Sequence, residues 1–419
     1  MNITIIALGS RGDTQPYVAL ALGLQQAGHS VRLCAGDNFQ EFVTGYGIDF
    51  LPIGVDIQHF INTRIPQVLE SGRNIISAIR QMSEEGTAAA DIMWKNVQIA
   101  CEGCDVICAN ILGIGAACIA QQRHLPCFLL HTMPLIGRTR TVAPIFLSQR
   151  WKLGGSLNLL LHDMTEGLLK QMLRQPINQW RAAAGVPPLP RGGWRFDSLP
   201  GLTVPMLYAY SAAIVPRPAD WLPHWQATGY WFLDAPPTWQ PPADLVNFLE
   251  AGDPPVYIGF GSIANRRPEH VTRIVLDALK QTGQRGILAT GWGGLAQIEM
   301  PDTVFCADAI PHDWLFPRVS AVVHHGGAGT TAAGFRAGVP TIVVPHLGDQ
   351  FYWGSHAERL GVGARPIPHK RLTVERLADA IRQVTSDSAL RQRAASLGAA
   401  IRAEDGVGTA VRLIAEYRP

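Results

Sequence analysis

The chain has 419 residues, enough for two or three domains, and 47% of them are hydrophobic, so a large core can be buried. Its formal net charge is +2, which argues against a nucleic-acid-binding surface. The first residues lack a basic n-region and break at glycine. The longest apolar run, Val106 to Ala120, falls short of the roughly 20 residues that span a bilayer. We therefore expect a cytoplasmic globular protein.

Strands and helices alternate from the first residues onward. A continuous apolar run, as in a strand covered on both faces, stands at 3–8, and further strands are expected at 29–35 and 48–53. Helical patterns fill 15–28 and 38–47, and the alternation resumes with strands at 105–110 and 126–131 around a helix at 113–124. This order is typical of a parallel, doubly wound sheet.

Two segments, 57–100 and 140–185, are looser, helical, and rich in apolar and aromatic residues. They are too long for simple connections. We interpret them as helical insertions around a cleft, although ordinary helix cores explain any single residue equally well.

The cysteines do not point to a metal. Cys101, Cys104 and Cys108 are the closest of the seven, but no fourth ligand follows at a regular offset. Reduced structural thiols in a reducing compartment are expected.

A proline-rich stretch, 228–250, indicates a linker, and a second alternating series follows it. Its strands are expected at 255–262, 285–290, 304–307, 321–325 and 341–345, and its helices at 269–283, 330–338, 349–361 and within 373–417. The fold class is therefore α/β, with two Rossmann-like doubly wound domains facing a cleft. We place the first domain at 1–235 and the second at 236–400. A C-terminal helix at 401–419 is expected to pack back toward the first domain.

The stretch "VVHHGGAGTTAAGFRAGVP", 322–340, places two histidines at the carboxyl end of a strand, the edge where such sheets bind ligands. Bare glycine backbone and the start of a helix follow, with Thr330 and Thr331 as further hydroxyl donors. Helix N-termini bind anions, so a diphosphate fits here. The alternative is a tight turn that simply needs small residues.

Two more turns point to the same edge. Asp349 and Gln350 follow another strand, and a neighbouring carboxylate and amide suit vicinal sugar hydroxyls. An Asp helix cap with an exposed Gln is the alternative. Gly259, Gly261 and Ser262 end the first strand of the second series without the Lys of a P-loop.

Asp13 stands at the end of the first strand, in a turn that is not a dinucleotide fingerprint. It is either a general base or the N-cap of a helix starting near Gln15. The Arg-Gly-Asp tripeptide of this turn is a coincidence, because the turn belongs to the fold. Metal motifs are absent from the sequence, and we expect no metal site.

These motifs resemble the inverting, nucleotide-sugar-dependent glycosyltransferases of family 1 with the two-domain GT-B fold. The matching stretches are 9–29, 310–340, 345–354 and 217–233, and the likeness covers nearly the whole chain. It is greatest to the sterol and lipid glucosyltransferase branch and its bacterial relatives, which overlap with macrolide and glycopeptide glycosyltransferases.

The resemblance implies a set of donor-binding residues. His325, Gly327, Ala328, Gly329, Thr330 and Ser262 would contact the diphosphate, Ile310 the uracil, and Asp349 and Gln350 the sugar. The ribose-binding glutamate of plant enzymes falls near Ala333, which puts that contact in doubt. Asp13 takes the place of their catalytic histidine. Lower-ranked acceptor contacts are Phe60, Trp94, His131 and Phe146.

The implied reaction is inverting transfer of a hexose, glucose from UDP-glucose, to a lipophilic acceptor such as a sterol, without cofactor or metal. The expected partners are the nucleotide-sugar donor and the lipophilic acceptor, with no nucleic acid and at most peripheral membrane contact. Alternatives are an epimerase of the same fold, glycosylation of a natural-product aglycone from a TDP-sugar, and a non-catalytic binding module. Acceptor identity, the donor base and the oligomeric state stay open.

Overall fold

The computed structural model divides the chain into two compact units, each described here by itself. It describes residues 1–55, 90–147, 154–261, 268–289, 295, 299–308 and 310–418. Unit 1 comprises Met1–Pro144, Leu153–Leu233 and Asp405–Pro419, and unit 2 comprises Ile145–Lys152 and Asp234–Glu404. The sequence places the main division at 235; the structure places it after Leu233 and counts 145–152 with unit 2.

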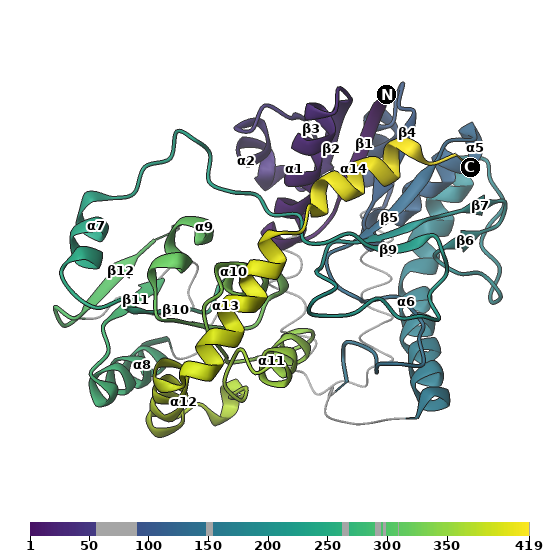
Figure 1. Ribbon diagram of the computed structural model, residues 1–419. Coiled ribbons are helices and arrows are strands. Elements are labelled where there is room, and N and C mark those ends of the chain that lie inside the picture. The colour runs from purple at the N-terminus through teal and green to yellow at the C-terminus, as the bar shows by residue number, and fades with distance from the viewer. Residues whose placement is uncertain are drawn as a thin grey trace. The chain divides into compact units, whose positions relative to one another are not determined.

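Unit 1 holds a seven-stranded sheet in the order β3-β2-β1-β4-β5-β8-β9, with every neighbouring pair parallel (Figure 1). Its strands are β1 (Asn2–Ala7), β2 (Ser30–Ala35), β3 (Asp49–Pro52), β4 (Val106–Ala109), β5 (Cys127–His131), β8 (Met206–Tyr208) and β9 (Trp225–Ala227). The chain runs from β1 outward to one side and then returns to the other side of β1. This reversal is the switch point at which doubly wound sheets bind ligands.

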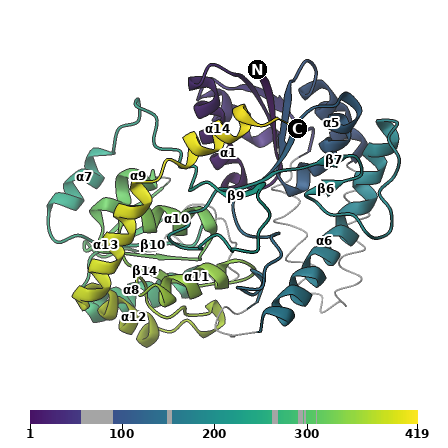
Figure 2. The same cartoon turned by 45° about the vertical axis from the view of Figure 1, so that its right-hand side comes forward.

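The helices of unit 1 cover this sheet. They are α1 (Arg11–Gln26), α2 (Gln40–Thr44), α5 (Ala117–Arg123), α6 (Gly155–Ala183) and α14 (Gly406–Glu416), with 3₁₀ turns η1 (Asp37–Phe39) and η2 (Ile111–Ala116) and a two-stranded ribbon of β6 (Ser198–Leu199) and β7 (Leu202–Thr203). The chain end returns to unit 1, because Ala410 and Ile414 of α14 lie in the core cluster that holds Val18 and Leu24 of α1. Figures 1 and 2 show α14 beside α1.

Unit 2 holds a five-stranded parallel sheet in the order β12-β11-β10-β13-β14. Its strands are β10 (Val256–Gly259), β11 (Gly286–Ala289), β12 (Val304–Ala307), β13 (Ala321–His324) and β14 (Thr341–Val343). Its helices are α7 (Ala243–Glu250), α8 (Pro268–Thr282), α9 (His312–Leu315), α10 (Ala328–Ala337), α11 (Gln350–Arg359), α12 (Val374–Ser386) and α13 (Ser388–Arg402), with 3₁₀ turns η4 (Phe316–Arg318) and η5 (His369–Arg371).

Successive residues of the unit 2 strands pack into different cores. Val256 and Ile258 belong to the cluster with α8 and α12, whereas Tyr257 between them belongs to the cluster with Leu245 and Phe316. A strand buried on both faces needs an unbroken apolar run, which is the pattern of its sequence. The predicted α/β class with two doubly wound sheets is confirmed. Within the described residues, no helix is long and apolar enough to cross a bilayer.

Candidate functional site

In unit 2, three loops leave the sheet at one edge. Gly259 of β10 is in register with His324 of β13, and His324 is in register with Val343 of β14. The loops after these three strands therefore start at the same level, as the sequence predicts. Ser262, which the sequence assigns to the first loop, lies outside the described residues.

His324 fixes the turn between β13 and α10. Its side chain is fully buried, and its Nδ1 accepts a hydrogen bond of 3.1 Å from the backbone N–H of Gly326. Burial, with smaller contributions from two neighbouring imidazoles, holds its pKa well below the usual value, so the ring is neutral. Gly326 has a φ of +93°, and a Cβ there would meet Gln350. The sequence analysis assigns no separate role to His324. The feature that could have indicated this structural role is its position as the last residue of a buried strand.

The His325 ring lies against two glycines. A Cβ on Gly261, whose φ is +64°, would lie 2.8 Å from its Cε1, and a Cβ on Gly327 would also clash with the ring. Burial lowers the pKa of His325 to about 4, and its Nδ1 has no hydrogen-bond partner among the described residues. A neutral imidazole with an unpartnered nitrogen is therefore held beside bare backbone.

Helix α10 begins at this point without a side-chain cap, its N-cap being Gly327. The first-turn N–H groups of a helix have no acceptor inside it, and here they belong to Ala328, Gly329 and Thr330. A Cβ on Gly329 would meet nothing within 4 Å, so space is open there. Thr331 is different, because its buried hydroxyl donates to the Gly327 carbonyl at 2.9 Å. The expectation that both threonines add donors is thus wrong for Thr331.

The loop after β14 uses Gln350 to close itself. Its Oε1 accepts from the N–H groups of His346 (2.7 Å) and Leu347 (3.2 Å), and the side chain is buried rather than exposed. Because both hydrogen bonds use Oε1, the amide nitrogen of Gln350 is the atom left for the predicted contact with the sugar. Asp349 directs its Oδ2 to the indole N–H of Trp353 at 3.1 Å rather than to the start of α11, so it does not act as a side-chain cap.

His346 is a member of this edge that sequence reasoning missed. Its ring stacks on His369 with centroids 4.1 Å apart, and its Nδ1 donates to the Val344 carbonyl at 3.1 Å. Burial lowers its pKa to about 4. Ile310, the predicted base contact, is half-buried and packs against the cluster of Tyr257 and Phe316.

In unit 1, Asp13 stands one turn into α1, after β1. Its Oδ2 accepts from both the backbone N–H and the hydroxyl of Ser10, each at 2.8 Å. The helix starts at Arg11 with Ser10 as N-cap, so the alternative of Asp13 as N-cap of a helix near Gln15 is wrong; Asp13 is the third helical residue of a capping box. Burial raises its pKa, while the two bonds from Ser10 oppose that shift.

Gly9 explains how the carboxylate fits. Its φ is +148°, and a Cβ there would lie 2.5 Å from Asp13 Oδ2. The neighbouring strands end at the same edge, where Asn110 follows β4 and donates to the Leu8 carbonyl at 2.6 Å. His131 ends β5, fully buried and stacked 4.9 Å from Tyr208. Burial lowers its pKa to about 3, and its Nε2 has no partner among the described residues.

Of the other predicted acceptor contacts, the structure describes Trp94 and Phe146 but not Phe60. Trp94 is 7% exposed and packs 5.6 Å from Trp180, which is a core position. Phe146 is 54% exposed and belongs to a segment counted with unit 2. Phe60 lies outside the described residues. Across the described part of the chain, no three His, Cys, Asp or Glu side chains gather as metal ligands would.

Comparison with known families matches both units. The glycosyltransferase family 28 N-terminal domain matches residues 3–137, and the C-terminal domain of the erythromycin biosynthesis protein CIII-like family matches residues 275–410.

Curated relatives are similar over the full chain. A sterol 3-beta-glucosyltransferase of Arabidopsis thaliana is 36% identical over 100% of this chain and 66% of its own length. A sterol 3-beta-glucosyltransferase of Aspergillus clavatus is 36% identical over 99% of this chain but only 29% of its own length. The chain thus spans less than a third of the fungal relative.

Solved structures share the fold. The glycosyltransferase of kitacinnamycin superposes with a TM-score of 0.71 at 20% identity, covering 100% of this chain and 99% of that one. A spinosyn rhamnosyltransferase complexed with thymidine diphosphate gives 0.67 at 18% identity, covering 99% and 100%. Two parallel sheets, two family matches and these likenesses agree: the chain belongs to the family 28 and erythromycin CIII-like glycosyltransferases of the GT-B fold.

Proposed function

We propose that this protein transfers glucose from UDP-glucose, with inversion, to the hydroxyl of a lipophilic alcohol of the sterol type. The 36% identity to the plant sterol 3-beta-glucosyltransferase over all of this chain supports the acceptor class. The observation that carries the reaction is the uncapped start of α10 beside the neutral, buried His325. Such a start binds anions, and a nucleoside diphosphate is the leaving group of this reaction.

Asp13 is the general base of the proposed reaction. Burial raises its pKa, which makes its carboxylate a stronger base than an exposed aspartate. Ser10 holds one carboxylate oxygen and so orients the group. The acceptor hydroxyl gives its proton to Asp13 as its oxygen attacks the anomeric carbon from the face opposite the diphosphate. A single displacement of an α-linked donor yields a β-glycoside.

The diphosphate leaves toward α10. Backbone N–H groups of Ala328, Gly329 and Thr330, the helix dipole, and a hydrogen bond from His325 stabilise the charge that develops on it. Ser262 contributes from the loop after β10, and Ile310 contacts the uracil. Asp349 and the amide nitrogen of Gln350 bind the hexose hydroxyls.

His131 is the acceptor contact with the best support. It ends β5 at the sheet edge that also carries Asp13, and its Nε2 is unpartnered among the described residues. A neutral imidazole there suits an alcohol oxygen on an otherwise apolar molecule. Phe60 and Phe146 stay secondary proposals, and Trp94, which packs on Trp180 in the core, would act only by supporting residues that contact the acceptor.

The test is to incubate the protein with a panel of nucleotide-sugar donors and lipophilic alcohols, and to detect the products by mass spectrometry. We expect UDP-glucose to be consumed only when a sterol is present, with or without chelator. Consumption of UDP-glucose without any acceptor would contradict transfer and favour an epimerase. A TDP-sugar donor with a natural-product aglycone is the second candidate, favoured by the fold shared with a rhamnosyltransferase complexed with thymidine diphosphate. Binding without turnover of any pair would favour a non-catalytic module.

A further inference from the structure

Cys101 and Cys104 stand at the two ends of a tight turn in unit 1, directly after the helix at 90–100. The backbone N–H of Cys104 donates to the Cys101 carbonyl at 3.4 Å, which closes a β-turn over Glu102 and Gly103. Gly103 has a φ of +68°, which suits glycine in such a turn. The ends of a β-turn lie within about 7 Å, and the Cα atoms of a disulfide are about 4.4–6.8 Å apart. The turn therefore sets the spacing that a disulfide needs.

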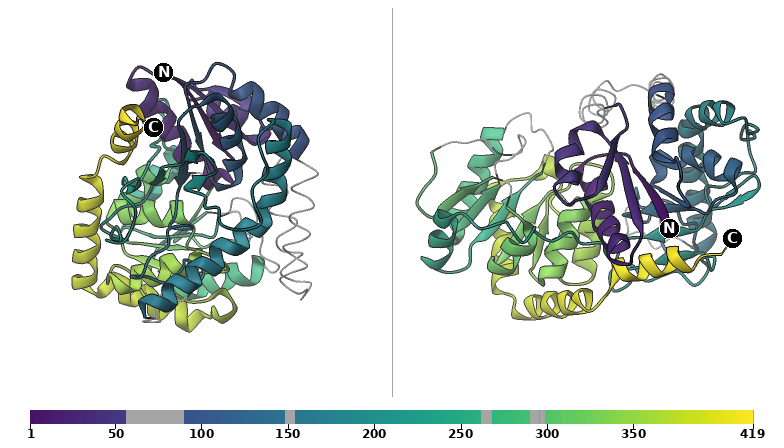
Figure 3. Two further views of the ribbon diagram at one scale, coloured as in Figure 1. Left: turned by 90° about the vertical axis from the view of Figure 1, so that its right-hand side faces the viewer. Right: turned by 90° about the horizontal axis from the view of Figure 1, so that it is seen from above.

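This turn is held by the first strand of the chain. Asn2 Nδ2 donates to the Gly103 carbonyl at 3.1 Å, and the backbone N–H of Asn2 donates to Asp105 Oδ2 at 2.7 Å. The hydroxyl of Thr4 donates to the Ala100 carbonyl at 2.7 Å. Figure 3 marks the N-terminus, next to which the turn lies. The two cysteines are thus kept near each other by the folded unit.

The two thiols differ in how readily they ionise. The Cys101 thiol donates a hydrogen bond to the sulfur of Cys104, and this bond, together with burial, raises the pKa of Cys101. The same bond and the Arg123 cation hold the pKa of Cys104 below its usual value, although burial and the Asp105 carboxylate oppose them. The thiolate is the form of cysteine that attacks an oxidant. Cys104 is therefore the better nucleophile, and Cys101 is its protonated neighbour.

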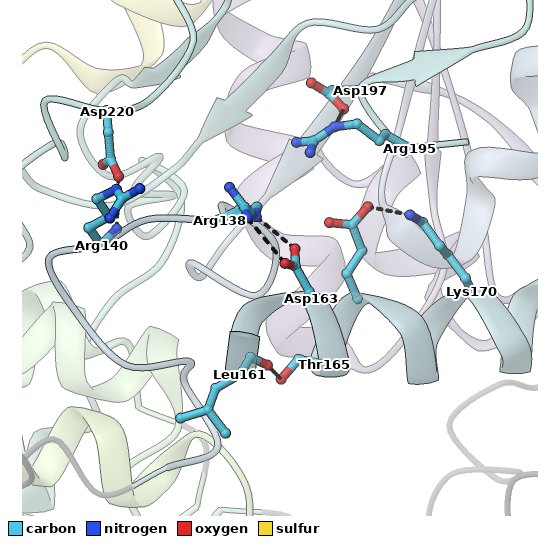
Figure 4. A network of polar contacts seen from close by, with 10 residues as sticks. Arg138, Arg140, Leu161, Asp163, Thr165, Lys170, Arg195, Asp197 and Asp220 are labelled. Carbon is cyan, nitrogen blue, oxygen red and sulfur yellow. Dashed lines mark hydrogen bonds and ion pairs between the residues drawn. The ribbon is translucent and has the colours of Figure 1, made fainter. Parts of the chain in front are cut away.

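Arg123 brings a positive charge to the turn. Its Nη1 donates to the Cys101 carbonyl at 2.7 Å. The charge of another arginine in unit 1, Arg138, is neutralised by Asp163, as Figure 4 shows. Among the residues that the structure describes, Arg123 has no such carboxylate partner. Its charge is left to stabilise a thiolate on Cys104.

The other five cysteines lack this combination. All seven are free thiols, and burial raises the pKa of each of these five. Four of them are at most 1% exposed: Cys34, Cys108, Cys118 and Cys127. The fifth, Cys306 in unit 2, is half-buried and so more exposed than Cys104, which is 8% exposed. Exposure alone therefore favours Cys306, whereas thiolate character favours Cys104.

We propose that Cys101 and Cys104 form a redox-active dithiol that hydrogen peroxide oxidises to an intrachain disulfide. The Cys104 thiolate attacks one peroxide oxygen, the O–O bond breaks, and a sulfenic acid forms. The departing hydroxide takes from solvent the proton that the Cys104 thiol had released, which gives the first water. The Cys101 sulfur then attacks the sulfenic sulfur, and the S–O bond breaks. The released hydroxide takes the proton of the Cys101 thiol, which gives the second water.

The balance is two thiols and one peroxide to one disulfide and two waters, with two electrons passing from the sulfurs to the peroxide oxygens. A dithiol reductant restores the thiols by exchange. The proposal does not rest on the transfer reaction, since the thiols are measured without donor or acceptor.

The test treats the folded, full-length chain with hydrogen peroxide at pH 7, denatures it in N-ethylmaleimide, and cleaves it after Glu102. We expect the fragments that end at Glu102 and begin at Gly103 to stay joined until dithiothreitol is added, with fragment masses that place the link between Cys101 and Cys104. Cys104 should be oxidised at least about tenfold faster than Cys306, because each unit by which a thiol pKa is lowered increases the thiolate about tenfold.

Three variants sharpen the result, and thermal melting checks that each is folded. Cys104→Ser should abolish the link, and Cys101→Ser should stop at a sulfenic acid on Cys104 that dimedone traps. Cys306→Ser is the matched control and should form the link like the wild type. The proposal is overturned if the wild-type fragments separate without reductant, if they stay joined in Cys104→Ser, or if Cys306 is oxidised as fast as Cys104. The wild-type result does not depend on the folding of any variant.

Discussion

The N-terminal ends of α1 and α10 occupy similar places in the sequence but differ in the group that accepts their hydrogen bonds. Both follow a strand at the carboxyl edge of a parallel sheet, and both are reached through a glycine of positive φ, Gly9 and Gly326. At α1, Asp13 folds back and accepts from the N–H of Ser10. At α10, Gly327 is the N-cap and no side chain caps the helix.

The difference supports the proposal that the α10 start, and not the α1 start, binds the anion of the donor. At the start of α1 the carboxylate of Asp13 already supplies a negative charge near the positive end of the helix dipole, so no outside anion is needed there. The same carboxylate is the proposed base. A helix that begins on glycines keeps its N–H groups and dipole for an anion from outside. Each prediction below transfers a feature of one start to the other or removes it.

The largest effect is expected when α10 receives its own carboxylate. Gly327→Asp places an anion where the diphosphate belongs and crowds His325, so kcat/KM should fall by about 10⁴-fold, the loss of more than one preorganised donor. Steady-state kinetics measure this. Gly192→Ala, in unit 1 and away from α10, is the control, because a Cβ there also meets nothing within 4 Å, and its kcat/KM should stay close to wild type. Equal losses in the two variants would contradict the comparison.

Asp13→Asn removes the base and leaves the shape of the capping box. We expect kcat to fall by about 10³-fold while the affinity for UDP is unchanged, because Asp13 is assigned to the acceptor rather than the donor. Single-turnover kinetics and calorimetry separate the two quantities. Asp49→Asn, an exposed carboxylate paired with Arg32 in the same unit, should keep the wild-type rate. A full rate in Asp13→Asn would sink the assignment.

The pH profile follows from the same carboxylate. Asp13 acts when ionised, and burial raises its pKa above that of an exposed aspartate. The rate should therefore rise with pH through a midpoint above that of an exposed aspartate and level off once the carboxylate is ionised. Ser10→Ala removes the hydroxyl bond that stabilises the charged form, so the midpoint should move to higher pH. A midpoint unmoved by Ser10→Ala would show that another group titrates.

His325→Gln should have a smaller effect, with UDP affinity about tenfold weaker at neutral pH, the value of one hydrogen bond to a charged group. The imidazole has a pKa of about 4 when free, and a bound diphosphate raises it. Binding then takes up a proton, so affinity should increase as pH falls toward 4 and become level below it. Calorimetry of both proteins isolates this dependence, since UDP titrates identically in each. An identical pH dependence in His325→Gln would contradict it.

The smallest effect concerns the two threonines at the α10 start. Thr331→Ala removes a bond to the Gly327 carbonyl and should lower the free energy of unfolding by about 1 kcal/mol without changing kcat/KM. Thr330→Ala, whose side chain is not held in this way, should instead weaken UDP binding slightly. Thermal unfolding and calorimetry distinguish the two. A loss of UDP affinity in Thr331→Ala alone would reverse the assignment.

Much of the fold is readable from apolar runs. Strands such as β1 and β10 are buried on both faces, and their sequences show it directly. β8 and β9 were missed, because each is only three residues long and sits among glycine, proline and aromatic residues without a pattern. The sequence predicts that α1 starts near Gln15, because Pro16 is typical of the first turn of a helix. The helix in fact starts at Arg11, with the capping box of Ser10 and Asp13 at its N-terminus.

The sequence predicts where the candidate site lies, but it does not predict the contacts that hold that site in place. Glycine spacing located the edge at His325 and Gly327, since a close approach of backbone to ligand needs glycine. The lock of His324 on Gly326, the stacking of His346 on His369, and the commitment of Gln350 to its own loop depend on three-dimensional partners. Sequence spacing cannot tell which of two adjacent histidines makes the hydrogen bond within the turn and which one is left without a partner.

The most direct measurement compares calorimetric binding of UDP and of uridine, in the presence of chelator, to the wild type and to Gly327→Asp. If the α10 start holds the pyrophosphate, wild-type protein binds UDP at least about 100-fold more tightly than uridine, and Gly327→Asp binds the two alike. Equal wild-type affinity for both compounds, or an undiminished preference for UDP in Gly327→Asp, would contradict it.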